Sequence, residues 1–180
     1  MPEGAVLLVT DSTILRWFPP LRAAWGFQGE QTTVPITGEN DRRALFGAIN
    51  IRTGHRLVLS RPRQRQEDFQ AFLRHMRERY GGRAIWLLLD KSSFHQAAKS
   101  QQLAERLRVN LVWLPKQCPE LNSMDHLWRE LDRLIRANLQ YPSVDAEAAY
   151  AQDWVMGLTA VEALRKAGAL SEDFWLKTFM

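Results

Sequence analysis

Three aspartates stand where carboxylates can do chemistry. Asp11 follows the apolar run AVLLVT, Asp90 follows the apolar run AIWLLL, and Asp125 lies in the first turn of an amphipathic segment. Both runs have the length and composition that are typical of buried strands. Because open α/β sheets gather their functional groups at the carboxyl ends of strands, we expect the three carboxylates to meet at one sheet edge.

Carboxylates without a histidine or cysteine cluster are hard oxygen ligands that suit Mg²⁺ or Mn²⁺. The chain has one cysteine, Cys118, which excludes a cysteine-based metal cage and an intramolecular disulfide. Two ions about 4 Å apart form the arrangement that supports in-line phosphoryl transfer. Asp11, Asp90 and Asp125 therefore predict a site for divalent cations that acts on phosphodiesters.

Each candidate also has an ordinary structural interpretation. Asp125 stands three residues after Asn122, a good N-cap, and can cap the same helix. The pair Asp11-Ser12 is common turn chemistry. His95 falls in a helical segment, where a lone histidine is more often a hydrogen-bonded surface residue than a ligand. The residues alone leave these alternatives open.

The elements that must position the aspartates follow from hydrophobic periodicity. Strands are predicted at 5–10, 32–37, 44–51, 56–60, 84–89 and 109–115, with a tight turn at Thr53-Gly54. Helices are predicted at 67–80, 92–107, 122–139, 144–156 and 159–167. The helix after Asn122 should bury one apolar stripe, made of Met124, Leu127, Trp128, Leu131, Leu134 and Ile135.

Strands that alternate with helices in the second half demand parallel pairing, whereas the first half is an antiparallel meander. The economical solution is an α/β fold, a mixed five-stranded sheet flanked by helices, which resembles the ribonuclease-H-like fold. We expect a catalytic domain over 1–140 and a helical extension over 141–180. Its helices and a late apolar cluster (Phe174, Trp175, Leu176 and Phe179) either cover the core or form a patch for a homodimer.

Basic residues concentrate in the middle of the chain. The net charge is +4, and residues 41–83 hold eleven arginines against four acids. This distribution predicts a surface that faces phosphates, with Arg61, Arg63 and Arg65 in the connector RPRQRQ as candidates for DNA contact. Arginines 74, 77 and 79 are either DNA contacts or a solvated helix face. Trp17 and Trp25 either pack over a core edge or stack on bases.

The segments around the aspartates resemble the signatures of a known family. LLLDKSSFH around Asp90 and LPKQCPELNSMDHLW around Asp125 are similar to the second and third signatures of DDE/D transposases of the mariner superfamily, in its bacterial insertion-sequence branch. VTDSTI around Asp11, followed by the segment 25–29, is similar to the first signature. Thirty-four residues separate Asp90 from Asp125, and the likeness extends over about 6–139.

The resemblance implies a DNA strand-transfer enzyme. By it, Asp11 bridges two Mg²⁺ or Mn²⁺ ions, and Asp90 and Asp125 each complete one site. The implied reaction cuts transposon ends and joins the freed 3′-hydroxyls to target DNA at a TA dinucleotide, with no covalent protein–DNA intermediate. His95 matches a histidine that often follows the second aspartate in the family, and would orient the substrate or a metal-bound water.

Some residues depart from the family pattern. Lys91 stands where asparagine is usual, and either pairs with a phosphate or weakens metal binding by repulsion. Lys116 and Ser123 replace residues that are commonly proline, and Lys116 is a further candidate for DNA contact. Asp125 is shorter than the glutamate that is usual in this branch.

Family members carry helix-turn-helix domains ahead of the catalytic domain, and no such pattern precedes Asp11. We therefore expect a helix-turn-helix partner or an upstream reading-frame product, and weak, sequence-tolerant DNA binding by this chain. One alternative is a catalytically silent transposase remnant that binds DNA or assists assembly. Another is a nuclease or junction resolvase that cuts without joining. Short apolar runs and a single cysteine predict a cytoplasmic protein without a membrane partner.

Overall fold

A computed structural model describes residues 4–23, 25, 27–29, 33–36 and 38–179. One mixed sheet has the strand order β3-β2-β1-β4-β5. Its strands are β1 (Val6–Arg16), β2 (Arg42–Asn50), β3 (Arg56–Arg61), β4 (Ile85–Leu89) and β5 (Val109–Trp113). The helices are α1 (Gln66–Tyr80), α2 (Ser93–Gln96), α3 (Ala98–Arg106), α4 (Ser123–Leu131), α5 (Val144–Gly157) and α6 (Ala160–Lys166). The predicted mixed five-stranded α/β sheet flanked by helices is confirmed.

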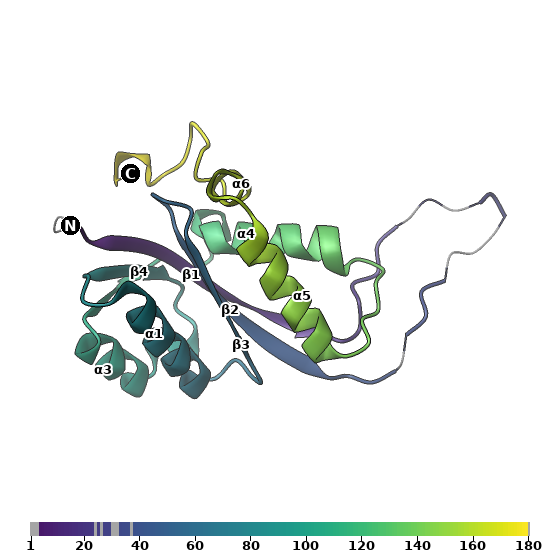
Figure 1. The fold of residues 1–180 in the computed structure, drawn as a ribbon, viewed down its shortest axis with the longest axis horizontal. Coiled ribbons are helices and arrows are strands. Elements are labelled where there is room, and N and C mark those ends of the chain that lie inside the picture. Colours follow the sequence, from purple (N-terminus) through teal and green to yellow (C-terminus); the bar gives the residue numbers. More distant parts are fainter. Residues whose placement is uncertain (1–3, 24, 26, 30–32, 37, 180) are drawn as a thin grey trace.

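Helices cover both faces of the sheet (Figure 1). On one face α1 and α3 enclose an apolar core that includes Phe46, Phe69 and Phe72. On the other face α4, α5 and α6 pack on a second core that includes Leu45 and Trp128. Both cores exist because successive residues of a strand point to opposite faces, and β1 and β2 are apolar on both. The sheet is therefore held rigidly between two layers.

Strand β1 is longer than its sequence predicts. Its parallel pairing with β4 covers only Val6–Val9, but its antiparallel pairing with β2 continues through Asp11 to Arg16. The prediction that Asp11 ends the strand is therefore wrong, because pairing with β2 overrides the turn preference of Asp-Ser. Asp11 instead lies two residues past the point where β4 stops pairing with β1.

The described parts of the connection from β1 to β2, residues 17–23, 25, 27–29, 33–36 and 38–41, extend away from the sheet and its helices (Figure 1). Residues 33–36 are not in a strand, so the predicted strand at 32–37 is wrong there; Thr32 and Thr37 lie outside the described residues. Trp17 is half-buried and its Nε1 donates to the Tyr141 carbonyl (2.7 Å), whereas Trp25 is fully exposed and does not pack over a core edge.

The predicted helix at 92–107 is divided at Ala97, whose extended backbone (φ −56°, ψ 131°) separates α2 from α3. Leu103 is buried and Leu107 is half-buried, whereas Ala98 is exposed. The division turns α2 so that His95 points into the core.

The helix that carries Asp125 also changes register. After α4 the chain makes a π-helical turn, η2 (Asp132–Arg136). The wider turn rotates the following residues, so Leu134 is exposed and leaves the predicted apolar stripe, while Arg136 becomes buried. Arg136 Nε donates to Glu147 Oε1 on α5 (2.6 Å), which ties the turn to the second layer. A buried ion pair thus replaces the apolar contact that the sequence suggests.

The C-terminal segments share the core with the sheet. The helices α5 and α6 form close to their predicted limits, and Leu176 is buried while Trp175 is partly exposed. Arg56 of β3 joins α5 to the sheet, since its guanidinium donates to the carbonyls of Val155 (2.9 Å), Met156 (3.0 Å) and Leu158 at the end of α5. A cation at a helix C-terminus also suits the helix dipole. No helix in the described part of the chain is long and apolar enough to cross a membrane.

Replacement of Arg56 should loosen α5. We expect Arg56→Lys to lower the free energy of unfolding by about 2 kcal/mol, because an ammonium group cannot reach carbonyls that a planar guanidinium spans. Thermal denaturation measures the change, with Arg74→Lys at an exposed position of α1 as the matched control. Equal melting temperatures for the two variants would contradict the role of Arg56.

Candidate active site

One cavity at the carboxyl edge of the sheet contains all three predicted aspartates. Its volume is about 430 Å³, and Asp11, Asp90 and Asp125 line it together. The other lining residues come from the turn after β4 and the loop after β5: Lys91, Ser92, Leu114, Pro115, Lys116, Gln117, Cys118, Pro119 and Asn122. The structure therefore brings together carboxylates that are up to 114 residues apart in the chain, and flanks them with two lysines.

Gly47 of β2 allows α4 to approach the sheet. It lies directly opposite Asp11 in the β1–β2 pairing. A Cβ at this position would lie 2.4 Å from Met124 Cε and 2.5 Å from the Trp128 ring. Since both are buried side chains of α4, any side chain at position 47 would push away the helix that carries Asp125.

Asn122 fixes the start of α4 against β1. Its Oδ1 accepts a hydrogen bond from the Met124 amide (3.1 Å), which confirms the predicted N-cap. Its Nδ2 donates to the carbonyl of Thr10 (3.3 Å), the residue before Asp11. Asn122 is buried, so one side chain both begins the helix of the third aspartate and attaches it to the strand of the first.

His95 and Ser92 hold the carboxylate of Asp90. His95 Nδ1 lies 2.7 Å from Asp90 Oδ1, and Ser92 Oγ donates to Oδ2 (2.6 Å). Because an ionised carboxylate only accepts, Nδ1 carries the hydrogen. Burial alone would raise the pKa of Asp90, but the hydrogen bonds from His95 and Ser92 outweigh it and lower the pKa to about 2. Asp90 is therefore ionised at neutral pH.

The interpretation of His95 as a surface residue is wrong. Its ring is buried and packs against Phe69 and Phe94, with ring centroids 4.4 and 4.2 Å apart. The ring does not line the cavity. His95 therefore acts on the site through Asp90 and not by direct contact with a ligand in the cavity.

Asp11 has the opposite electrostatic character. Burial raises its pKa to about 7; a hydrogen bond from the Ser12 amide opposes the rise, and the charges of Asp125 and Asp90 add to it. A carboxylate in this position is costly to ionise unless a cation lies beside it.

Asp125 projects from the first turn of α4, and Arg129 one turn later lies 2.5 Å from its Oδ2. The contact is electrostatic, since the same buried oxygen receives no hydrogen bond within the described structure.

As the side chains stand, no three histidine, cysteine or acidic residues among those described are grouped closely enough to hold a metal ion. The donor chemistry nevertheless fits a divalent cation, because three carboxylates line one cavity and burial disfavours the anion at one of them, Asp11.

The predicted DNA contacts lie at the same edge of the sheet in two groups. Lys91 and Lys116 line the carboxylate cavity itself. Arg63 and Arg65 line a neighbouring groove, whereas Arg61 pairs with Asp68 (3.0 Å). Arg77 bonds to the carbonyls of Gly81 and Arg83, so it caps α1 and is not a free DNA contact.

Sequence reasoning missed two residues that shape the site. Gly47 was part of a predicted strand, and a glycine inside a strand is the signal for a close approach that could have found it. Ser92 gives no such signal, because a serine after a strand is ordinary loop chemistry.

A model of the DDE superfamily endonuclease family matches residues 6–146 of this chain. The chain belongs to this family. The transposase resemblance that the sequence signatures suggest is thereby confirmed.

Relatives of this DDE endonuclease chain agree with the family. It is 26% identical over 136 residues to an uncharacterised 39 kDa protein of insertion element IS630 from Shigella sonnei, a match that covers 74% of this chain and 40% of the relative. The chain thus spans less than half the length of that curated relative.

Solved structures confirm the fold. A Mos1 transposase paired-end complex with the left transposon end matches with a TM-score of 0.70 at 15% identity, over 93% of this chain and 53% of that one. A Mos1 mariner paired-end complex with Mn matches with a TM-score of 0.69 at 15% identity, over 93% and 53%. At this identity the likeness establishes the ribonuclease-H-like arrangement of the sheet and its flanking helices.

Substitution of Gly47 should separate α4 from β1. We expect Gly47→Ala to lower the free energy of unfolding by about 1–3 kcal/mol, because the added Cβ meets Met124 and Trp128. Chemical denaturation measures the change. Gly82→Ala is the matched control, since no atom lies within 4 Å of that Cβ position. Equal stability of the two variants would show that α4 does not depend on this contact.

The raised pKa of Asp11 should make the metal-free protein less stable as pH rises. A folded-state pKa of about 7 lies above the unfolded value of 3.8, so the folded state holds the extra proton and stability falls between these limits as pH increases. From pH 5 to pH 8 we expect wild type to lose on the order of 2 kcal/mol relative to Asp11→Asn. Denaturation in EDTA at both pH values measures it, and parallel pH profiles would refute it.

Proposed function

We propose that this chain is the catalytic domain of a transposase that cleaves DNA and transfers strands at insertion-sequence ends in a divalent-metal-dependent reaction. The observation that carries the proposal is the cavity in which Asp11, Asp90 and Asp125 stand beside Lys91 and Lys116, in a chain of the DDE endonuclease family. The names of the Mos1 structures support DNA and a divalent metal as the ligands. Family members cover more sequence than this chain, so the activity of a whole transposase is part of the proposal.

Asp11, Asp90 and Asp125 are the residues that would hold two Mg²⁺ or Mn²⁺ ions. Bound ions would activate the attacking oxygen and neutralise charge on the leaving oxygen. The lowered pKa of Asp90 prepares it for this role, and a nearby cation would lower the raised pKa of Asp11 and favour its anion. Asp125 would have to release or share its ion pair with Arg129 to offer Oδ2 to a cation.

The chain's own residues bind and orient the substrate. Lys91 and Lys116 would contact non-bridging oxygens of the scissile phosphate, while His95 keeps Asp90 in one orientation. In cleavage, the oxygen of a water forms a bond to phosphorus, and the bond to the 3′ oxygen breaks as that oxygen gains a proton. In strand transfer, the freed 3′-hydroxyl attacks a target phosphodiester and displaces its 3′ oxygen. No covalent protein–DNA intermediate forms.

The same proposal includes the partners. A helix-turn-helix partner or an upstream reading-frame product would read the transposon ends, and a second copy of the chain would bring two ends together. Residues 1–140 would form the catalytic domain and 141–180 an extension packed on it. The cytoplasm would be the place of action. Isolated DNA binding by this chain would be weak and sequence-tolerant.

A second candidate is a catalytically silent module that binds DNA or assists assembly. The ion pair between Arg129 and Asp125 favours it, because this arginine occupies the place of a cation. Isothermal titration calorimetry with Mn²⁺ separates the two functions: a transposase domain binds the ion with measurable heat, and a silent module does not. A nuclease or resolvase would bind the ion but yield cut products without joined ones.

Nicking of supercoiled plasmid in Mn²⁺ tests the enzyme directly. We expect Asp90→Asn to lower the nicking rate by about a hundredfold or more. Loss of a metal ligand should lower activity at least as much as loss of a residue that orients such a ligand. Asp153→Asn, an exposed position on α5, loses the same charge and should nick at the wild-type rate. Undiminished nicking by Asp90→Asn would remove this cavity as the active site.

A further inference from the structure

A second basic feature lies at the carboxyl edge, beyond the carboxylate cavity. It is a groove of about 180 Å³, here called the arginine groove, lined by Ile14, Arg42, Arg43, Ala44, Pro62, Arg63, Gln64 and Arg65. We propose that the arginine groove binds phosphates of the DNA strand that extends from the carboxylate cavity. This inference rests on the proposed function and adds a binding surface for the DNA beyond the scissile phosphate.

Strand pairing places like charges together at the groove. Arg16 and Arg42 are direct partners at the end of the β1–β2 ladder, and both are exposed. Arg61 of β3 is paired with Ala44, so it projects from the same face as Arg42. Like charges directly opposite each other destabilise a strand pair. An anion bound between Arg16 and Arg42 would remove this repulsion.

Two acids near the arginine groove are already paired with arginines. Asp145 holds Arg43 through two hydrogen bonds (2.6 and 2.9 Å), and Asp68 holds Arg61. Glu67 accepts a hydrogen bond from Gln66 (2.8 Å). Three arginines of the groove are left without an ion pair in the part of the chain that the structure describes: Arg42, Arg63 and Arg65. Their guanidinium groups match the bidentate geometry of phosphate.

The arginine groove is connected to the carboxylate cavity through β1. Ile14 in the groove is three residues beyond Asp11, a separation of about 10 Å along a strand. Gln64 Nε2 donates to Ser12 Oγ (2.6 Å), so the groove loop is anchored beside the first aspartate. At about 3.4 Å per nucleotide, 10 Å corresponds to roughly three nucleotides of duplex DNA.

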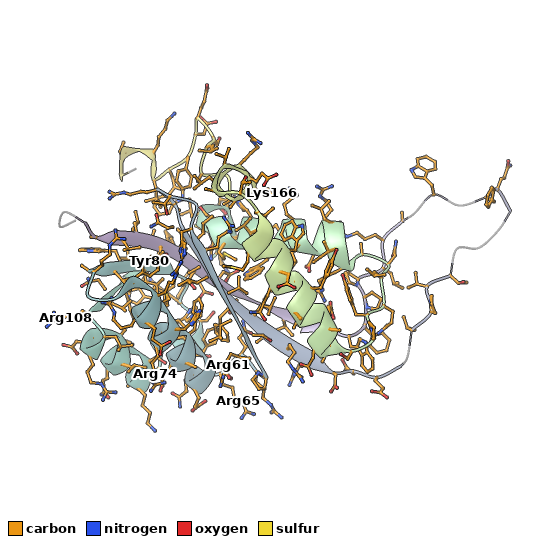
Figure 2. All side chains as sticks on the ribbon, in the orientation of Figure 1. Arg61, Arg65, Arg74, Tyr80, Arg108 and Lys166 are labelled. Carbon is orange, nitrogen blue, oxygen red and sulfur yellow. The ribbon has the colours of Figure 1, made fainter. Side chains whose placement is uncertain are left out.

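A shallow depression lies between the arginine groove and Ser92 of the cavity. It shares Gln64 and Arg65 with the groove, and its other lining residues are Gln66, Glu67, Ser93, Phe94 and Ala97. Figure 2 shows Arg61 and Arg65 together at the end of β3 and Arg108 apart from them; Arg108 directly precedes β5, at the amino edge of the sheet. The free cations of the groove are therefore on the side from which a substrate would reach the aspartates.

Charge-matched variants test the arginine groove. We would measure binding of a fluorescent duplex of arbitrary sequence by anisotropy at 50, 100 and 200 mM salt in Mg²⁺. We expect Arg42→Gln, Arg63→Gln and Arg65→Gln each to weaken binding about fivefold at 100 mM salt, and to reduce the slope of log affinity against log salt by about 0.9. Arg108→Gln removes the same charge at the other end of the sheet and should change affinity less than twofold.

The outcomes separate this inference from the proposed function. If the groove variants bind no more weakly than Arg108→Gln while wild type nicks plasmid, the arginine groove is refuted and the enzyme stands. Groove variants that lose affinity in a chain that never nicks DNA support the groove and refute the catalytic proposal. Absence of duplex binding by wild type at 50 mM salt would overturn the groove.

Discussion

The close contact between α4 and the β1–β2 pair determines the geometry of the carboxylate cavity. Gly47 leaves the space that Met124 and Trp128 fill, and Asn122 holds the first turn of the helix against Thr10. Because protein interiors are close-packed, this contact transmits the position of the strand to the helix. Asp125 faces Asp11 only because the backbone opposite Asp11 carries no side chain.

The three aspartates of the cavity differ in what their surroundings favour. Asp90 is stabilised as an anion by donors from its own turn and helix, whereas burial and two neighbouring carboxylates disfavour the anion at Asp11. Asp125 is balanced by an arginine on its own helix. At neutral pH Asp90 is ionised, whereas Asp11 lies close to its pKa, so a bound cation would release a proton from Asp11 and not from Asp90.

Much of this arrangement could be predicted from the sequence. Apolar runs ending in aspartate located β4 and the first half of β1, and the N-cap at Asn122 located α4. The errors have physical causes: pairing with β2 extended β1 through Asp11, and a buried ion pair at Arg136 accompanied a π-turn that turned Leu134 outward. The burial of His95 was missed because a helix break at Ala97 is not encoded by glycine or proline. Local patterns reveal elements, but contacts between distant residues decide where those elements end.

Because β1 continues through Asp11, the two walls of the cavity differ in rigidity. Asp11 is bonded within a ladder on rigid, doubly covered sheet, so only its side chain has freedom to rotate. The opposite wall is loop backbone from Leu114 to Pro119, where Gln117 holds a left-handed conformation (φ 58°). Under the proposed function, any rearrangement that completes metal coordination or admits DNA would therefore occur in this loop, while the position of Asp11 on the strand stays fixed.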